Sequence, residues 1–274
     1  MYEQFYGFRE KPFTLNPDPQ FLYLAPPHRR AMTMLEYALS RDAPFCLITG
    51  EIGSGKTTVL RHLLAHLGDS YTVGLINNPS AEFGPMLPWI SNAFGLPHQG
   101  LDPVTLYQQF TDLLVADYAA GRKVLLVVDE AQNLNAQRLE ELRVLSNINS
   151  DKHLVLQTIL VGQPELRDTI RSSALRQLAQ RIVADYHIEA LDLEQTRTYV
   201  RHRLRKAGGR VSLFSNTAIR LAFDSSQGIP RLINQFCDRA LVYGYADNAT
   251  TIGGTLMRLV ISDRERHNLT PAPD

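Results

Sequence analysis

The sequence has few cysteines, and they are far apart. Cys46 and Cys237 are the two cysteines among 274 residues, and each lies in an apolar stretch. This number excludes a disulfide framework as the basis of the fold, so we expect buried thiols in a reducing compartment. Nothing in the cysteine pattern requires a metal cluster.

The chain also lacks a net charge and a long apolar run. Lys and Arg total 28, and Asp and Glu total 28, so the overall charge selects no class of partner. The first residues, Met1–Tyr6, have neither a basic region nor a small-residue cleavage site, and no apolar run approaches the roughly 18 residues that cross a bilayer. We therefore expect no transmembrane segment and a cytoplasmic location, with any position at the inner membrane depending on a partner.

The sequence does contain a phosphate-binding loop, which fits the pattern G-x-x-x-x-G-K-[ST]. It comprises Gly50-Glu51-Ile52-Gly53-Ser54-Gly55-Lys56-Thr57-Thr58. An apolar, strand-like run precedes this loop and a helical pattern follows it, as the motif requires. Glycines let backbone N–H groups turn toward triphosphate oxygens, and the helix N-terminus adds partial positive charge. We expect ATP or ADP to bind here, with Lys56 at the β- and γ-phosphates and Thr57 on Mg²⁺.

Around this loop, residues 45–190 alternate short apolar strands with helices. This alternation is typical of a parallel sheet covered by helices on both faces. The expected strands are Phe45–Thr49, Tyr71–Ile76, Val124–Val128, Val155–Val161 and Val183–Ile188. Right-handed crossovers bring their carboxyl ends to one edge, where ligands of such sheets bind. We predict an α/β P-loop core over 45–190.

Other segments flank that core. Residues 1–44 contain an aromatic, proline-rich arm and a helix at His28–Ser40. We expect the arm to pack on the core; alternatively, arm and helix wall the adenine pocket. A helical lid is predicted over 191–266 and a disordered tail over 267–274. The expected lid helices are Glu194–Ala207, Ser215–Ser226, Pro230–Asn248 and about Leu256–Arg266.

Two acidic residues end the third expected strand. The run Val124–Val128 is continuously apolar and leads into Asp129 and Glu130. Buried acids require a cation nearby, and Mg²⁺ is the natural candidate. Asp129 is expected to hold Mg²⁺ through water, and Glu130 to orient and deprotonate the attacking water. The alternative is that the pair merely opens the loop before a helix at Leu134–Asn147.

Two further polar residues are predicted to reach the triphosphate. Gln163 follows the fourth strand and would project between Lys56 and Glu130 as a sensor, if that strand lies between the first and the third. Arg231 is placed in the first turn of a lid helix by Gly228 and Pro230, and is predicted to be a second sensor. The alternatives are a polar turn residue for Gln163 and a surface ion pair for Arg231.

An arginine before the last strand is predicted to act on a neighbouring protomer. Arg181 is the first choice for an arginine finger offered in trans, and Arg176 is the second. A surface salt bridge is the alternative for either residue.

The first lid helix is rich in cations. They are Arg197, Arg201, Arg203, Arg205 and Lys206, with His202 among them. A basic helix of this kind can bind the phosphates of a nucleic acid. No aromatic residues alternate with these cations, so we favour a solvated helix face over nucleic-acid binding.

Assembled, these residues resemble those of the AAA+ ATPases, and more narrowly the family of general secretion pathway protein A (ExeA/GspA) and the pilus-biogenesis protein MshM. The motifs that carry the resemblance extend over almost the whole chain. They are Met1-Tyr2, Phe5–Phe8, Lys11–Phe13, Pro17–Pro19, Phe21–Leu24, Thr49–Thr58, Asp129–Leu134, Leu139–Arg143, Gly162–Leu166, Gln180–Ile182 and Gly228–Arg231. Transposition helper ATPases of the TniB type look like more distant relatives.

The resemblance implies a five-stranded core of strand order 5-1-4-3-2, a helical lid, and self-association into a ring or filament. The roles that carry over by position are those of Lys56, Thr57, Asp129, Glu130, Gln163, Arg181 and Arg231. It further implies ATP-dependent assembly of a bacterial envelope complex for type II secretion, pilus formation or exopolysaccharide export. Longer members look like an ATPase followed by a membrane span and a peptidoglycan-binding domain, and these 274 residues are expected to contain the ATPase part. The alternative function is a DNA-binding transposition helper.

Overall fold

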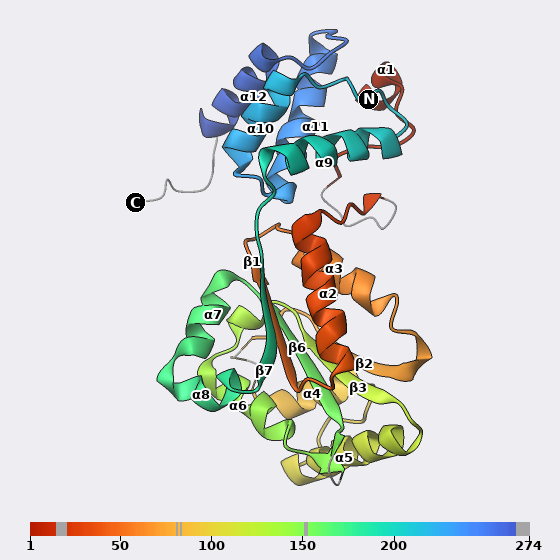
Figure 1. The fold of residues 1–274 in the computed structure, drawn as a ribbon, viewed down its shortest axis with the longest axis vertical. Coiled ribbons are helices and arrows are strands. Elements are labelled where there is room, and N and C mark those ends of the chain that lie inside the picture. The colour runs from red at the N-terminus through yellow and green to blue at the C-terminus, as the bar shows by residue number, and fades with distance from the viewer. Residues whose placement is uncertain (15–20, 81, 83, 151–152, 267–274) are drawn as a thin grey trace. The chain divides into compact units, whose positions relative to one another are not determined.

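The structure is a computed structural model that describes residues 1–14, 21–80, 82, 84–150 and 153–266. The chain divides into two compact units (Figure 1). The α/β unit comprises residues 28–51 and 56–188, and the helical unit comprises residues 1–27, 52–55 and 189–274. The tail expected at 267–274 lies outside the described residues.

A five-stranded parallel sheet forms the centre of the α/β unit, with the order β2-β3-β6-β1-β7. Its strands are β1 (Phe45–Gly50), β2 (Tyr71–Ile76), β3 (Lys123–Val128), β6 (Leu156–Gly162) and β7 (Ile182–Ile188). A separate antiparallel pair consists of β4 (Asn149–Ser150) and β5 (His153–Leu154). The predicted fold class and strand order are confirmed, and β6 lies between β1 and β3 as the sensor hypothesis for Gln163 required.

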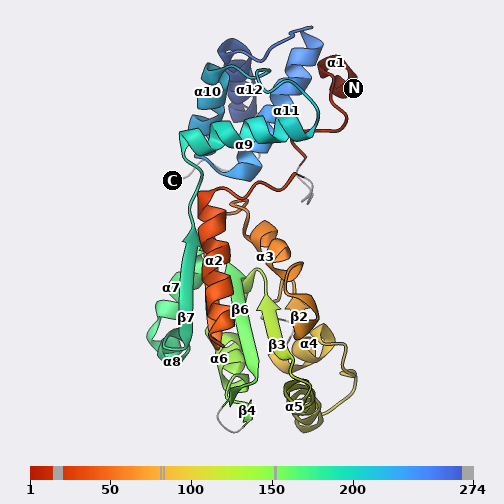
Figure 2. The ribbon, with the colours of Figure 1, turned by 45° about the vertical axis from the view of Figure 1, so that its right-hand side comes forward.

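Helices cover both faces of this sheet (Figures 1 and 2). Because side chains alternate along a strand, Val124, Leu126 and Val128 of β3 face one core, and Leu125 and Val127 face the other. The first core is completed by α4 (Met86–Ala93), α5 (Pro103–Ala119), α6 (Ala136–Leu145), α7 (Pro164–Arg171) and α8 (Arg176–Ala179). The second is completed by α2 (Pro26–Ser40) and α3 (Lys56–Leu64). Burial between the two cores explains why the central strands β1, β3 and β6 are mainly apolar.

The helix after the acidic pair is shorter than predicted. We expected Leu134–Asn147, whereas α6 spans Ala136–Leu145. A short 3₁₀ turn, Ala131–Asn133, comes first. The Asn135 side chain then accepts a hydrogen bond from the N–H of Arg138 at 3.0 Å, which caps the helix. Because of this cap, α6 begins at Ala136 and not at the predicted Leu134.

The helical unit contains the N-terminal arm as well as the C-terminal helices. Its elements are α1 (Tyr2–Tyr6), α9 (Leu193–Lys206), α10 (Asn216–Ser226), α11 (Pro230–Ala246) and α12 (Gly254–Arg266). Phe8, Phe13 and Phe21 of the arm are buried in the same core as α9 to α12. The expectation that the arm packs on the α/β core is therefore wrong, because its aromatic rings fill the centre of the helical unit instead. Within the described part of the chain, no helix combines the length and the hydropathy that a membrane span needs.

Gly228, between α10 and α11, provides a stability prediction. Its φ is +73°, and a Cβ atom there would lie 1.9 Å from the carbonyl oxygen of Leu191. The N–H of Leu191 donates to the Gly228 carbonyl at 3.0 Å, which holds the two segments together. We therefore expect Gly228→Ala to destabilise the helical unit by more than about 2 kcal/mol, as measured by chemical denaturation.

Gly7→Ala is the matched control for this substitution. Gly7 also has φ +73°, but a Cβ atom added there would have no heavy atom within 4 Å. Its replacement should therefore lower the free energy of unfolding only by the cost of placing a residue with a side chain at positive φ, about 1 kcal/mol. Equal losses of stability in the two variants would contradict the steric explanation.

Candidate functional site

The phosphate-binding loop joins β1 to α3. Gly53 and Gly55 have φ values of +84° and +101°, a region that residues with side chains rarely adopt. Within the α/β unit, the Lys56 ammonium donates to the carbonyl oxygens of Gly50 at 2.8 Å and Glu51 at 3.1 Å. Burial lowers the pKa of Lys56, and the nearby carboxylates, Glu130 first, oppose that shift. The lysine is thus oriented into its own loop, where phosphate oxygens could replace the carbonyls as acceptors.

Thr57 and Asp129 meet although they lie 72 positions apart in the sequence. The Thr57 hydroxyl donates to Oδ2 of Asp129 at 3.0 Å. Asp129 is buried, and burial raises its pKa while hydrogen bonds from Thr57 and the Glu130 N–H lower it. A buried carboxylate beside a hydroxyl is an oxygen donor set that suits Mg²⁺. The residues present therefore fit the predicted metal.

Glu130 follows directly and has an unusual backbone. Its φ of +56° and ψ of +38° place it in the left-handed region, which costs a residue with a side chain about 1 kcal/mol or more. Its carboxylate accepts a hydrogen bond from Nε2 of Gln132 at 2.7 Å. The acid is thus held by a side chain of the 3₁₀ turn that follows it.

Gln163 lies at the carboxyl end of β6, where the prediction placed it. It is half-buried and precedes the first residue of α7, with no hydrogen bond from its side chain to that helix. Its backbone N–H donates to Oε1 of Gln132 at 3.0 Å. The backbone of Gln163 is therefore tied to the acidic pair through Gln132, and contact of its side chain with a γ-phosphate remains a prediction.

Arg181 lies between α8 and β7 and makes bonds within its own unit. Its guanidinium donates to the Ser146 hydroxyl at 2.6 Å and also to the Asn147 side-chain oxygen. Both acceptors follow the last residue of α6. The arginine is thus positioned by two uncharged polar side chains, while Arg176 is exposed. The finger role remains a prediction for either residue.

Arg231 lies in the first turn of α11, as the sequence predicted. Its N–H donates to the carbonyl oxygen of Gly53 at 3.3 Å, and both residues belong to the helical unit. A Cβ atom on Gly53 would lie 2.4 Å from the Cβ of Arg231. Glycine at position 53 is therefore needed for this close approach as well as for its backbone angles. The role of Arg231 as a sensor is untested and stays a prediction.

The cations of α9 do not form a single solvated face. Arg203 is 6% exposed; it donates to the carbonyl oxygen of Pro12 at 2.6 Å, and its guanidinium lies 4.7 Å from the ring centre of Phe21. The ring of His202 lies 5.2 Å from that of Tyr23. The favoured interpretation of the sequence is therefore wrong for Arg203, because this residue binds the arm. The same contacts remove Arg203 from any surface that could bind a nucleic acid.

A known family model matches the segment that carries the loop and the acidic pair. The model is described as an AAA domain, and it matches residues 39–170. The chain contains an AAA domain. Lys56, Asp129 and the strands β1, β2, β3 and β6 lie within this match, whereas β7 follows it.

The AAA domain and its flanks are also similar to a curated protein. Over 249 residues the chain is 43% identical to general secretion pathway protein A of Aeromonas hydrophila. The alignment covers 90% of this chain and 45% of that protein. The chain thus spans less than half the length of this relative.

Solved structures share the fold at low sequence identity. The ORC2 protein of Aeropyrum pernix, solved as ADPNP–ADP complexes, has a TM-score of 0.69 and 19% identity, with coverage of 96% of this chain and 74% of that one. Cdc6p of Pyrobaculum aerophilum has a TM-score of 0.66 and 17% identity, with coverage of 93% and 75%. At these identities the likeness shows the AAA fold alone.

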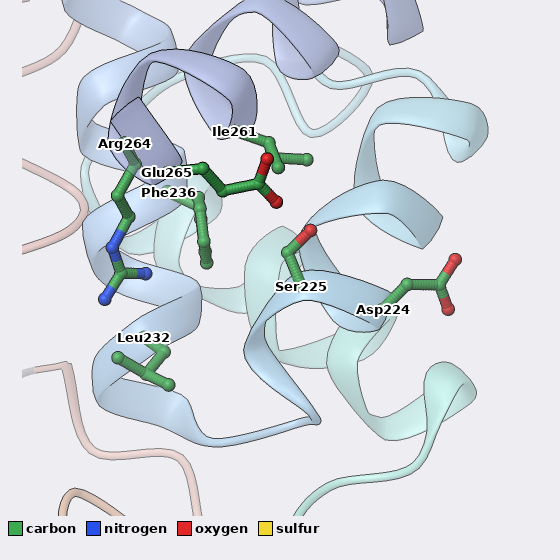
Figure 3. Close-up of a pocket in the computed structure, with 7 residues that line it drawn as sticks. All are labelled: Asp224, Ser225, Leu232, Phe236, Ile261, Arg264 and Glu265. Carbon is green, nitrogen blue, oxygen red and sulfur yellow. The ribbon is translucent and has the colours of Figure 1, made fainter. Parts of the chain in front are cut away.

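The helical unit contains a cavity of about 430 Å³ (Figure 3). It lies among α10, α11 and α12. The side chains of Arg264, Phe236 and Leu232 lie together in the left half of Figure 3. Its lining residues are Asp224, Ser225, Leu232, Phe236, Ile261, Arg264 and Glu265. None of these is a residue predicted to bind the nucleotide.

Sequence reasoning missed the residues that hold the predicted side chains in place. Gln132 holds Glu130, and Ser146 with Asn147 holds Arg181. Gln132 lies in the 3₁₀ turn before α6, and Ser146 and Asn147 follow the last residue of α6. The one available signal was the position of Gln132, two residues after a predicted catalytic acid.

Proposed function

We propose that this chain binds ATP with Mg²⁺ and hydrolyses it to ADP and phosphate. The observation that carries the proposal is the 3.0 Å bond between Thr57 and Asp129, directly behind a phosphate-binding loop. A hydroxyl from the loop and a carboxylate from the neighbouring strand end are what an Mg·ATP site requires. The AAA domain match supports the same conclusion.

Each residue has a separate part in the proposed reaction. Lys56 binds the β- and γ-phosphate oxygens in place of its own loop carbonyls, and Thr57 and Asp129 hold the metal side of the site. Mg²⁺, when bound, neutralises charge on the phosphate oxygens. Glu130 takes a proton from the attacking water, whose oxygen bonds to the γ-phosphorus as the bond to the bridging oxygen breaks. Gln163 and Arg231 are proposed to contact the γ-phosphate, and Arg181 of a neighbouring protomer the transferred group.

We further propose that the hydrolysis cycle serves assembly of a bacterial envelope complex. The support is the 43% identity to general secretion pathway protein A. A protomer that closes on ATP and relaxes after hydrolysis can drive or regulate such an assembly. The proposed partners are further copies of this chain and a secretion, pilus or polysaccharide-export protein.

Asp129→Asn is the variant that tests the metal site. We expect it to lose the enhancement of ATP affinity by Mg²⁺, by about tenfold or more, because an amide oxygen replaces a carboxylate that a divalent ion attracts. Affinity in the presence of a chelator should change little. Isothermal titration calorimetry with ATP, in Mg²⁺ and in EDTA, measures both quantities.

Asp168→Asn is the matched control, since it removes a carboxylate that is 81% exposed on α7. Full enhancement by Mg²⁺ in Asp129→Asn would overturn the metal assignment. Purified protein with no affinity for ATP or ADP in Mg²⁺ would overturn the proposed function as a whole. A protein that binds ATP but releases no phosphate would be a nucleotide-holding regulator instead.

A further inference from the structure

Gln132 connects two parts of the candidate site through a single side-chain amide. Its Nε2 donates to Oε2 of Glu130 at 2.7 Å, and its Oε1 accepts from the N–H of Gln163 at 3.0 Å. A carboxylate only accepts hydrogen bonds and a backbone N–H only donates them. The orientation of the amide is therefore fixed, because a flipped amide would lose both bonds.

The end of β6 is shaped to admit this amide. A Cβ atom on Gly162 would lie 2.9 Å from Oε1 of Gln132 and 2.6 Å from a methyl carbon of Leu166. Any side chain at position 162 would thus displace the amide or α7. Gly162 is the last residue of the strand that lies between those carrying the loop and the acidic pair. Close packing of this kind holds Gln132 in one place in the α/β unit.

The backbone of Glu130 makes this restraint necessary. The acid has a left-handed backbone conformation, φ +56°, and directly precedes the 3₁₀ turn Ala131–Asn133. A glutamate side chain has three rotatable bonds, and a base must lie within hydrogen-bond reach of the water it deprotonates. The bond from Gln132 engages one carboxylate oxygen and leaves the other to accept from a water.

We propose that Gln132 is a positioning residue for ATP hydrolysis, which holds the carboxylate of Glu130 toward the attacking water and ties it to the backbone of the sensor candidate Gln163. This inference rests on the proposed function, in which Glu130 is the base. Gln132 acts through Glu130 and does not itself touch the substrate.

Gln132→Glu tests the proposal, because the two side chains have nearly the same shape. The new carboxylate still accepts from the Gln163 N–H but cannot donate to Glu130, which it repels. We expect kcat for phosphate release to fall roughly 10- to 100-fold, the value of a hydrogen bond to a charged group, with KM for ATP changed less than about threefold. Gln137→Glu makes the same change in charge at an exposed position of α6 and should behave as the parent. A raised KM with unchanged kcat in Gln132→Glu would overturn the proposal.

The double variant Glu130→Gln/Gln132→Glu separates positioning from general damage. If Gln132 acts through Glu130, adding Gln132→Glu to Glu130→Gln causes no further loss of turnover. The swapped pair can again form a hydrogen bond, so the melting temperature without nucleotide should rise above that of Gln132→Glu alone. Losses of turnover that multiply, or a melting temperature that does not recover, would contradict the proposal.

A second substitution keeps the test valid if Gln132→Glu does not fold. Gln132→Met retains the length of the side chain and removes both hydrogen bonds without adding charge. It should also lower kcat and leave KM nearly unchanged; parent-like turnover would overturn the proposal. If the parent protein does not hydrolyse ATP, the proposed function fails. If it does, and Glu130→Gln is impaired while both Gln132 variants are not, only this inference fails.

Discussion

Glu130→Gln is expected to bind ATP and to hydrolyse it roughly 10²- to 10⁴-fold more slowly than the parent chain. The amide has nearly the shape of the acid but cannot accept the proton of the attacking water. Lys56, Thr57 and Asp129 remain in place, so affinity for Mg·ATP should change little. Steady-state phosphate release measures the rate, and calorimetry measures the affinity.

Glu165→Gln is the control that distinguishes the loss of proton transfer from the loss of a nearby negative charge. Glu165 is exposed in the first turn of α7, and its charge also acts on Lys56, as that of Glu130 does. If loss of a nearby negative charge slowed the reaction, both variants would be slow. Unchanged turnover in Glu130→Gln, or an equal loss in Glu165→Gln, would remove Glu130 from the role of general base.

The centre of the sheet could be predicted because β1, β3 and β6 are buried on both faces and are therefore mainly apolar. The edge strands β2 and β7 are only partly buried, and their apolar residues still indicated strands. All five strands were predicted to within one residue at either end. Their order came from resemblance to a family, because strand pairing depends on contacts between segments far apart in the sequence. The phosphate-binding loop could be predicted for a different reason: its spacing follows directly from the geometry of phosphate binding.

The unit in which the N-terminal arm is buried could not be predicted from the composition of the arm. Phe8, Phe13 and Phe21 indicate that the arm must be buried, but an apolar ring packs equally well on any apolar surface. Arg203 decides the outcome, since it donates to the carbonyl of Pro12 and lies against Phe21. In the sequence this arginine is one of several cations on α9, and nothing distinguishes it from its exposed neighbours.

The residues that orient the side chains of the candidate site could not be predicted from the sequence, for a related reason. A functional acid or lysine stands out because its motif has a fixed spacing, whereas its supporting partners need only reach it in space. The side chain of Gln132 reaches Glu130 because Glu130 has a left-handed backbone conformation and a 3₁₀ turn follows it. The sequence analysis assigned no conformation to the residues between Glu130 and the helix expected at Leu134–Asn147, and so it could not place that side chain.

Arg181→Ala is expected to lose ATP hydrolysis by about 10³-fold or more if the side chain acts as an arginine finger. An arginine finger stabilises charge that develops on the transferred phosphoryl group, so affinity for ATP should be less affected than turnover. Arg181 is oriented by Ser146 and Asn147 at the end of α6, which gives it a defined position within its own protomer. Arg176→Ala tests the second candidate in the same assay, because this exposed arginine lies nearby on α8. A larger loss of turnover in Arg176→Ala than in Arg181→Ala would assign the finger role to Arg176.

Mixing Arg181→Ala with Glu130→Gln protomers decides whether the arginine acts in trans. In a head-to-tail assembly, a site built from the Glu130 of the first variant and the Arg181 of the second contains both groups. Random mixing of equal amounts should create such sites at about one quarter of the interfaces, so activity should rise well above that of either variant alone. The rise should depend on protein concentration, because it requires association. No recovery at concentrations where the protomers associate would exclude a finger supplied by a neighbour and leave Arg181 as a structural partner of α6.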